Sequence, residues 1–461
     1  MDKRPNILFI LTDDQRFDMI HSLGAERLKT PNLDALAARG CAFTQAHIPS
    51  GPSGAVCMPS RAMIHSGRTL FHLENQGEAI PPEHITLGET LRRGGYRAFG
   101  CGKWHNGPAA FARSFSEGDN IFFGGMWDHW NVPLNRYDPT GEYDNEINFV
   151  ANFFEDNAPL RVHCDKFEPG RHSSELLTDT AISALDRLDG EDPFFLYLAY
   201  LAPHDPRTMP EEFRRMYNPE DIKLPPNFQT THFDFGVHTI RDEVLAAYPR
   251  DEREIRRHIA EYYAMITHLD HQIGRVMEAL KRKNLLDNTI IVMAGDNGLA
   301  VGQHGLMGKQ NHYEHSIRVP LLMAGPGIPA GQKINRYVYL MDIYPTLCDL
   351  VNLPIPDSVE GLSFAPMFRD PNHTTRRALY FGYAELIRSV KDERFKLIEY
   401  RNFAHRRQLF DLQNDPWETR DLIDDPAYQG QVERLLRLRE EFRAQWEDSG
   451  HPMSRAYWEG Q

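Results

Sequence analysis

Four short apolar runs of the chain each lead into side chains that can bind metals or move protons. ILFILT is followed by Asp13 and Asp14, and TIIVMAG is followed by Asp296 and Asn297. YRAFGC leads into GKWH, and FFLYLAYLAP leads into His204. In open parallel α/β sheets, ligands bind beyond the carboxyl ends of the strands. We therefore expect these side chains to converge on one site.

The residue types at these strand ends indicate a site for the transfer of an anionic group. Hard oxygen ligands, which suit Ca²⁺ or Mg²⁺ better than zinc, come from Asp13, Asp14, Asp296 and Asn297. We expect Ca²⁺, with Mg²⁺ as the alternative. Cations and proton donors come from Lys103, His105, His204 and Lys309. Each feature alone also fits an ordinary turn or a structural histidine, so the prediction depends on their occurring together.

Cys57 is the candidate nucleophile. Pro59 fits the first turn of a helix, which places Cys57 at a helix N-terminus, where negative charge is stabilised. Two simpler interpretations are open. The thiol can be a buried structural cysteine, the usual state of an unpaired one. It can also be a thiolate nucleophile, which needs a histidine partner and no oxygen-rich metal site.

The residues around Cys57 support a third interpretation. C-x-P-S-R followed by Ser-Gly resembles the signature of type I sulfatases, with matches at Cys57, Pro59, Ser60, Arg61, Ser66 and Gly67. His65 stands where leucine is more usual. Other segments between about residues 5 and 450 are similar to that family: NILFILTDDQR, GYRAFGCGKWH, APHDP, AGDNG, GKQNHYEHSIRVPLLMAGPGI and LFDLQNDPWETRDL. The chain is identified as a member of this family, within the alkaline phosphatase superfamily.

The resemblance implies that a maturation enzyme converts Cys57 to Cα-formylglycine. It also implies one Ca²⁺ held by Asp13, Asp14, Cys57, Asp296 and Asn297. One hydroxyl of the hydrated aldehyde attacks sulfur, and deprotonation of the other re-forms the aldehyde as sulfate leaves. The implied catalytic residues are Cys57, Arg61, Lys103, His105, His204 and Lys309. Among them, His204 protonates the leaving oxygen and Lys309 binds a sulfate oxygen, so both also bind substrate.

The alcohol portion of the substrate is expected to contact variable loops. The candidates for this subsite are His72, Trp127 and His312, with Glu74, Asn75, His129, Trp130 and Arg207 as further ones. Aromatic and polar side chains suit a sugar ring. The net charge of −14 disfavours nucleic acid and long polyanions. We therefore expect a small or terminal sulfated sugar, with a choline-sulfatase-like substrate as an alternative.

Three rival functions are open at this point. A phosphodiesterase or phosphonate monoester hydrolase of the same superfamily more often carries C-G-P-A-R, whereas this chain carries CMPSR. A catalytically idle relative would bind sulfated ligands only, but every expected catalytic position is filled. A mutase-like metalloenzyme would need two metals and a serine or threonine nucleophile.

The elements that must position these residues predict an α/β fold. We expect an alkaline-phosphatase-like α/β/α sandwich over residues 1–370 and a smaller C-terminal α+β domain over 371–461. Core strands are expected over 6–12, 96–101, 193–201, 289–294 and 319–324, and helices over 31–39, 86–93, 252–283 and 339–352. The C-terminal strands are expected over 378–383, 386–390, 395–400 and 408–411, before a helix over 425–447. Segments 107–175 and 203–250 are irregular and are expected to form long loops.

Composition narrows the remaining possibilities. The five cysteines lack CxxC spacing, which argues against a disulfide framework or structural zinc. No run approaches 18 apolar residues, so no membrane span is expected. The start, MDKRPNILFILTDD, fits a buried strand better than a signal peptide. We expect a cytoplasmic protein from this chain, and a periplasmic or secreted one if a signal has been removed. The oligomeric state is left open.

Overall fold

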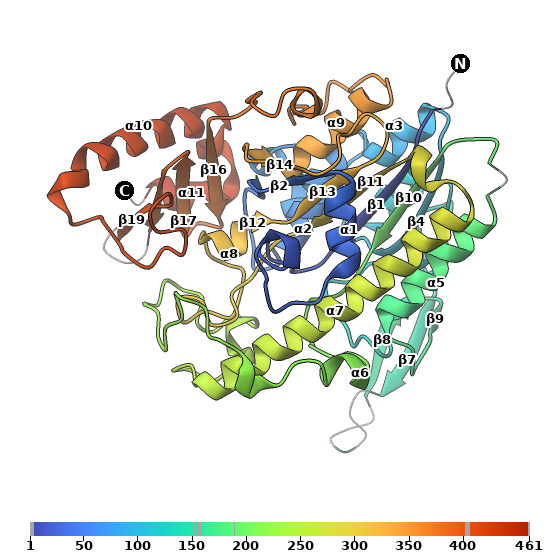
Figure 1. Ribbon diagram of the computed structural model, residues 1–461, viewed down its shortest axis with the longest axis horizontal. Coiled ribbons are helices and arrows are strands. Elements are labelled where there is room, and N and C mark those ends of the chain that lie inside the picture. Colours follow the sequence, from blue (N-terminus) through green and yellow to red (C-terminus); the bar gives the residue numbers. More distant parts are fainter. Residues whose placement is uncertain (1–3, 151–153, 155–157, 189, 402–405, 460–461) are drawn as a thin grey trace.

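An eight-stranded mixed sheet lies at the centre of the protein (Figure 1). The computed structural model describes residues 4–150, 154, 158–188, 190–401 and 406–459. The strand order is β14-β2-β13-β11-β1-β10-β4-β5. These strands are β1 (Asn6–Thr12), β2 (Cys41–Phe43), β4 (Arg97–Lys103), β5 (Glu117–Phe122), β10 (Phe194–Ala199), β11 (Thr289–Gly295), β13 (Leu321–Ala324) and β14 (Gln332–Ile334). The run β11-β1-β10-β4-β5 is parallel, so its carboxyl ends share one edge.

Helices cover both faces of this sheet. Alternate residues of β1 enter different cores: Phe9 packs with one layer of helices and Leu8 with the other. The layer on the Leu8 side contains α1 (Pro31–Arg39), α5 (Ser173–Asp186) and α7 (Glu252–Arg282). The layer on the Phe9 side contains α2 (Cys57–Ser66), α3 (Leu87–Arg93), α4 (Pro108–Ser114) and α9 (Ile343–Leu350). The expected α/β/α arrangement is confirmed.

A second, antiparallel sheet forms near the C-terminus (red in Figure 1). Its strands are β16 (Ala378–Tyr383), β17 (Ile387–Asp392), β18 (Phe395–Tyr400) and β19 (Arg407–Asp411). Helix α10 (Gln429–Gln445) packs on it through Val432 and Leu435, against Val390 and Leu397. Helix α11 (Pro452–Glu459) follows. The smaller α+β unit is therefore present, while a boundary at residue 370 stays a prediction.

The segments expected to be irregular contain more structure than their composition suggests. Between residues 107 and 175, α4 is followed by β5, and β5 adds a strand to the main sheet.

The other short elements of the described chain are β3 (Ala46–His47), β6 (Pro133–Leu134), β7 (Glu146–Val150), β8 (Pro159–His163), β9 (Lys166–Phe167), α6 (Glu211–Arg214), α8 (Glu314–Ile317), β12 (Arg318–Val319) and β15 (Val338–Tyr339). Within the described residues, no helix has the length and apolar character needed to cross a membrane.

Candidate active site

The four predicted strand ends meet at one edge of the main sheet. Asp13 and Asp14 directly follow β1, and Lys103 is the last residue of β4. Asp296 directly follows β11, and its carboxylate accepts a hydrogen bond from the Asp14 backbone N–H at 3.1 Å. Lys103 Nζ donates to the Asp13 carboxylate. These contacts join three neighbouring regions of the sheet into a single buried site.

Helix α2 brings Cys57 to this edge. Its Sγ lies 3.5 Å from Lys103 Nζ and 3.6 Å from His105 Nδ1. The helix is fixed to the end of β11, because Ser60 Oγ donates to the Asp296 carbonyl at 2.6 Å. In the same way, Arg61 Nε donates to the Asp296 carboxylate at 2.8 Å. The motif residues Ser60 and Arg61 thus make contacts that hold Cys57 beside the strand ends.

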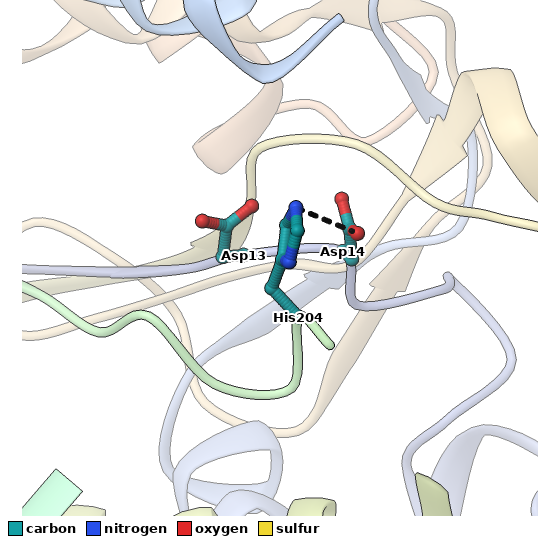
Figure 2. Close-up of side chains that lie close together, drawn as sticks. All are labelled: Asp13, Asp14 and His204. Carbon is teal, nitrogen blue, oxygen red and sulfur yellow. Dashed lines mark ion pairs between the residues drawn. The ribbon is translucent and has the colours of Figure 1, made fainter. Parts of the chain in front are cut away.

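The other side of the site is built around Asp14 (Figure 2). His204 Nε2 lies 3.6 Å from Asp14 Oδ2, and the ring lies between Asp13 and Asp14. Lys309 Nζ donates to Asp14 Oδ1 at 2.5 Å, and Asn297 Nδ2 donates to the same oxygen at 2.6 Å. Lys309 comes from the loop that follows β11. The site therefore has a thiol on one side and a histidine–lysine pair on the other.

The oxygen atoms of the site fit a hard cation. Asp13 Oδ1 and Asn297 Oδ1 are buried and have no hydrogen-bond partner in the described part of the chain. A buried oxygen without a partner is costly unless a donor or a metal satisfies it. Ligand atoms of Asp13, Cys57 and Asp296 lie within 4.8 Å of one another, as do those of Asp13, Asp14 and His204. The carboxylate and amide oxygens among these atoms are the donors that Ca²⁺ or Mg²⁺ prefers.

Charge is distributed unevenly over the carboxylates. Burial opposes ionisation of Asp13, but Lys103, His204 and Arg61 outweigh burial and hold the pKa of Asp13 well below its usual value. Burial and the charge of Asp13 raise the pKa of Asp296 to about 6. Of these two carboxylates, Asp13 therefore holds its negative charge more strongly than Asp296.

Burial also decides between two interpretations of Cys57. Its side chain is buried, and burial, only partly offset by Lys103, raises the pKa of the thiol. The thiol is therefore protonated at neutral pH, which disfavours a plain thiolate nucleophile. The pKa of His105, next to Cys57, is changed in the opposite direction. Burial and then Lys103 lower it well below the usual value for histidine.

The three residues predicted for the alcohol subsite lie in different surroundings. His72 pairs with Glu360 at 2.6 Å. Trp127 packs against Phe149 and Phe167, with ring centroids 6.3 and 6.4 Å apart.

His312 is buried, and its Nδ1 lies 2.8 Å from Ser389 Oγ on the C-terminal sheet. In the described chain, no hydrogen bond, ion pair or ring contact joins His72, Trp127 or His312 to the catalytic groups. Their role in substrate binding stays a prediction.

Three residues that support the site could not be identified from the sequence. Tyr262, on the buried side of α7, donates from its hydroxyl to the Asp14 carbonyl at 2.6 Å. Gly125 accepts a hydrogen bond from Lys103 Nζ. Arg241, 43% exposed, donates to Asp205 Oδ2 at 2.8 Å, next to His204. Tyr262 has the spacing of an ordinary core residue, and the other two lie in loops, so only the structure reveals them.

The fold and this site define a hydrolase of the alkaline phosphatase superfamily. The family profile described as sulfatase matches residues 5–353, and the profile described as N-sulphoglucosamine sulphohydrolase, C-terminal, matches residues 302–445. The chain belongs to the sulfatase family, and the protein is a sulfatase.

Known proteins of this family align over nearly the whole chain. An arylsulfatase of Clostridium perfringens is 28% identical, over 94% of this chain and 93% of its own. An N-acetylglucosamine-6-O-sulfatase of Bacteroides thetaiotaomicron is 25% identical, over 97% and 88%. A solved structure of a protein in complex with its substrate D-glucosamine-2-N,6-O-disulfate has a TM-score of 0.77 and 22% identity, covering 97% of this chain and 99% of that one. That likeness shows the fold.

Proposed function

We propose that this sulfatase hydrolyses sulfate monoesters of a small or terminal sulfated sugar, with residue 57 in the formylglycine form. The position of Cys57 carries the proposal: its Sγ lies 3.5 Å from Lys103 Nζ and 3.6 Å from His105 Nδ1, on a helix fixed to Asp296. Formylglycine supplies a hydrated aldehyde whose hydroxyl is the nucleophile. A buried, protonated thiol is poorly suited to that task.

The side chains around residue 57 take roles that follow from their positions. Arg61 Nη2 and Lys103 Nζ stabilise negative charge at residue 57; the former is buried without a hydrogen-bond partner in the described chain. His105 takes the proton that must leave residue 57 at the end of the cycle. His204 Nδ1 donates to the Asp205 carbonyl at 2.7 Å, so Nε2, 3.6 Å from Asp14 Oδ2, protonates the leaving oxygen from the imidazolium form of the ring. Such a general acid contributes about 10²–10⁴-fold.

The cation belongs to the same proposal. Ca²⁺ would be held by Asp13, Asp14, Asp296, Asn297 and residue 57, where it neutralises the sulfate. The chain offers a test that does not need activity: free Ca²⁺ at a hundred times Kd should stabilise the fold by about 3 kcal/mol. Asn297→Ala should lose most of the rise in melting temperature, and Asn148→Ala on the exposed strand β7 should keep it. No rise in the unchanged protein would contradict a Ca²⁺ site.

Relatives support a sugar substrate. Besides the N-acetylglucosamine-6-O-sulfatase, an ulvan-active sulfatase of Formosa agariphila is 27% identical over 92% of this chain. The choline-sulfatase of Rhizobium meliloti, 28% identical over 96%, supports the small-molecule alternative. Sulfate release should be measured from monosaccharides sulfated at each ring position, from choline sulfate and from long glycans. Hydrolysis of long internal chains alone would contradict the proposal.

Phosphonate or phosphate diester hydrolysis is the second candidate. A multifunctional alkaline phosphatase superfamily protein of Trinickia caryophylli is 28% identical over 92% of both chains. Against this, Ser60 Oγ bonds the Asp296 carbonyl at 2.6 Å, a contact that alanine in C-G-P-A-R could not make. The ratio of kcat/KM for 4-nitrophenyl sulfate to that for bis(4-nitrophenyl) phosphate separates the two activities. Mass analysis of the peptide that contains residue 57 tests for the aldehyde.

A further inference from the structure

Two buried histidines hold the loop that carries His204. His129 Nε2 lies 3.0 Å from the carbonyl oxygen of His204 itself. His172 Nε2 lies 3.0 Å from the carbonyl oxygen of Thr208, four residues further along the same loop. The two imidazole rings stack, with centroids 5.1 Å apart and planes inclined by 2°. Both residues are almost completely buried, so water does not compete for these bonds.

The partners of the two rings fix their tautomers. His172 Nδ1 accepts a hydrogen bond from the Ser174 backbone N–H, so its proton is on Nε2 and is donated to Thr208. His129 Nε2 faces a carbonyl and must also donate, so Nδ1 accepts from Ser173 Oγ at 2.8 Å. Burial lowers the pKa of His129 to about 4 and that of His172 to about 2, which keeps both rings neutral.

This pair connects the His204 loop to the start of a core helix. Ser173 and Ser174 are the first two residues of α5, whose buried side packs in the same core as β4 and β10. His204 Nδ1 is engaged by the Asp205 carbonyl at 2.7 Å, which leaves Nε2 directed toward Asp14 (Figure 2). The position of His204 Nε2 in the site therefore depends on the position of the loop backbone, which the two histidines fix.

We propose that His129 and His172 are positioning residues for His204, fixing its loop so that Nε2 reaches the leaving oxygen of the substrate. The inference rests on the proposed function, in which His204 is the proton donor. His129, a sequence candidate for the sugar subsite, is assigned by its contacts to this role instead. A displacement of about 1 Å in a reacting group can cost about 10²-fold in rate.

The dependence of rate on the leaving group tests this role. An alkyl sulfate needs its leaving oxygen protonated, whereas 4-nitrophenyl sulfate leaves readily without a proton. His129→Phe keeps a flat ring but removes both hydrogen bonds. We expect kcat on the alkyl sulfate to fall by about 10²-fold, kcat on 4-nitrophenyl sulfate by less than about threefold, and KM to change little. His129→Gln, whose amide can donate to the same carbonyl, should restore much of the loss.

The matched control is His268→Phe. His268 is buried and contacts the His172 ring edge-on, with centroids 4.7 Å apart, but it has no hydrogen bond to the loop in the described chain. This variant should leave the ratio of the two rates unchanged. Equal losses on both esters in His129→Phe, or no loss on either, would overturn the proposal.

Two further comparisons keep the result interpretable. If His129→Phe does not fold, Ser173→Ala removes only the hydroxyl that donates to Nδ1, and it should change the rate ratio in the same direction. An unchanged ratio would again overturn the positioning role. If the unchanged protein hydrolyses aryl phosphonates and no sulfate ester, the proposed function has failed on its own. The positioning role is then measured with a series of phosphonate leaving groups.

Discussion

Two residues of the active site adopt backbone angles that non-glycine residues rarely take. Asp14 has φ of 64° and His105 has φ of 76°. Such conformations cost about 1–3 kcal/mol and persist where surrounding contacts hold them. For Asp14 those contacts are the 2.6 Å bond from the Tyr262 hydroxyl to its carbonyl and the 3.1 Å bond from its N–H to Asp296. Both residues lie in the buried site at the carboxyl ends of the strands, where we propose that Asp14 holds the cation and His105 takes a proton from residue 57.

Sequence patterns could identify the residues at the strand ends but not the residues that support them. Asp13 and His204 follow strands, and Cys57 lies in a recognisable motif, so residue type and position were sufficient. Tyr262 and His129 act through backbone carbonyls, and this role leaves no trace in residue spacing. The alcohol subsite depends on loops, whose course is decided by tertiary contacts.

Removal of the Cys57 side chain should abolish catalysis and preserve the fold. Cys57→Ala is expected to lower kcat on a sulfate ester by roughly 10⁴-fold or more, because the nucleophile is lost. Its thermal midpoint should change by only a few degrees, because a single sulfur is removed. Cys348→Ala, at another fully buried cysteine, in α9, is the control and should retain activity. Activity of Cys57→Ala within tenfold of the unchanged protein would contradict the role of this residue.

His65 is predicted to reduce stability. Its ring is buried between Trp104 and Tyr197, with centroids 4.2 and 4.9 Å away, and Nε2 has no partner in the described chain. Leucine, more usual at this position, should raise the free energy of unfolding by about 1 kcal/mol at pH 7.5.

The advantage of leucine at position 65 should grow in acid. Burial lowers the pKa of His65 to about 3, below its value of about 6.5 in the unfolded chain. Stability from the neutral ring is therefore complete above pH 6.5 and is lost as pH falls, so His65→Leu gains about 2 kcal/mol more at pH 5. Urea unfolding at both pH values measures the difference. A variant less stable than the parent at pH 5 would refute this account.

At the scale of elements, the sequence located most helices and strands but misjudged their interruptions. The strand expected over 319–324 is two strands, because Pro320 lacks an N–H and separates β12 from β13. The helix expected over 339–352 is regular only from Ile343, after a 3₁₀ turn. Helix α5 was not among the expected helices and lies mostly beyond the segment 107–175, although Leu176, Leu177 and Ala181 have helical spacing.

Glu314, a buried carboxylate at the start of α8 (Glu314–Ile317), forms ion pairs with the C-terminal sheet. Glu314 Oε2 lies 2.7 Å from Lys391 Nζ, and Oε1 lies 3.2 Å from Lys396 Nζ. Burial opposes its charge, but the two lysines lower the pKa of Glu314 well below its usual value. Glu314→Gln leaves Lys391 without its carboxylate partner, while Lys396 keeps its ion pair with Glu418, and the change should cost about 3 kcal/mol.

The control for Glu314→Gln is an ion pair at the surface. Asp287, 95% exposed, pairs with Arg39 at 2.6 Å. Asp287→Asn should change the free energy of unfolding by less than about 1 kcal/mol. Chemical unfolding of the two variants, followed by fluorescence, gives the comparison. Equal effects would show that burial does not set the energy of the Glu314 contacts.

At the scale of the whole molecule, the interior holds many neutral histidines. Burial lowers the pKa of each to between about 2 and 4 for His47, His65, His129, His172, His232, His268 and His304. They occupy both cores and the contact with the C-terminal sheet. Because the same groups take up protons near pH 6.5 when the chain unfolds, they make the fold sensitive to mild acid.

We expect the protein to unfold between about pH 6 and pH 4.5 at 25 °C. Each of these histidines binds fewer protons in the folded state, so each removes up to about 1.4 kcal/mol of stability per pH unit below 6.5. Buried carboxyls oppose this: burial raises the pKa of Asp270 to about 6, so it takes up a proton in the folded state. The buried histidines outnumber such carboxyls, so the net effect of acid is a loss of stability. A total free energy of unfolding of about 5–15 kcal/mol is therefore lost within a few pH units.

The slope of the free energy of unfolding against pH gives the number of protons that the protein takes up when it unfolds. Urea midpoints at pH 7.5, 6.5 and 5.5 should fall by increasing steps, and calorimetry in buffers of different ionisation enthalpy should show uptake of several protons on unfolding. The pair His65→Leu and His268→Phe removes two of the contributing groups. The double variant should take up about two fewer protons on unfolding at pH 5. If the urea midpoint of the unchanged protein does not fall between pH 7.5 and 5.5, the buried rings are already charged in the folded protein.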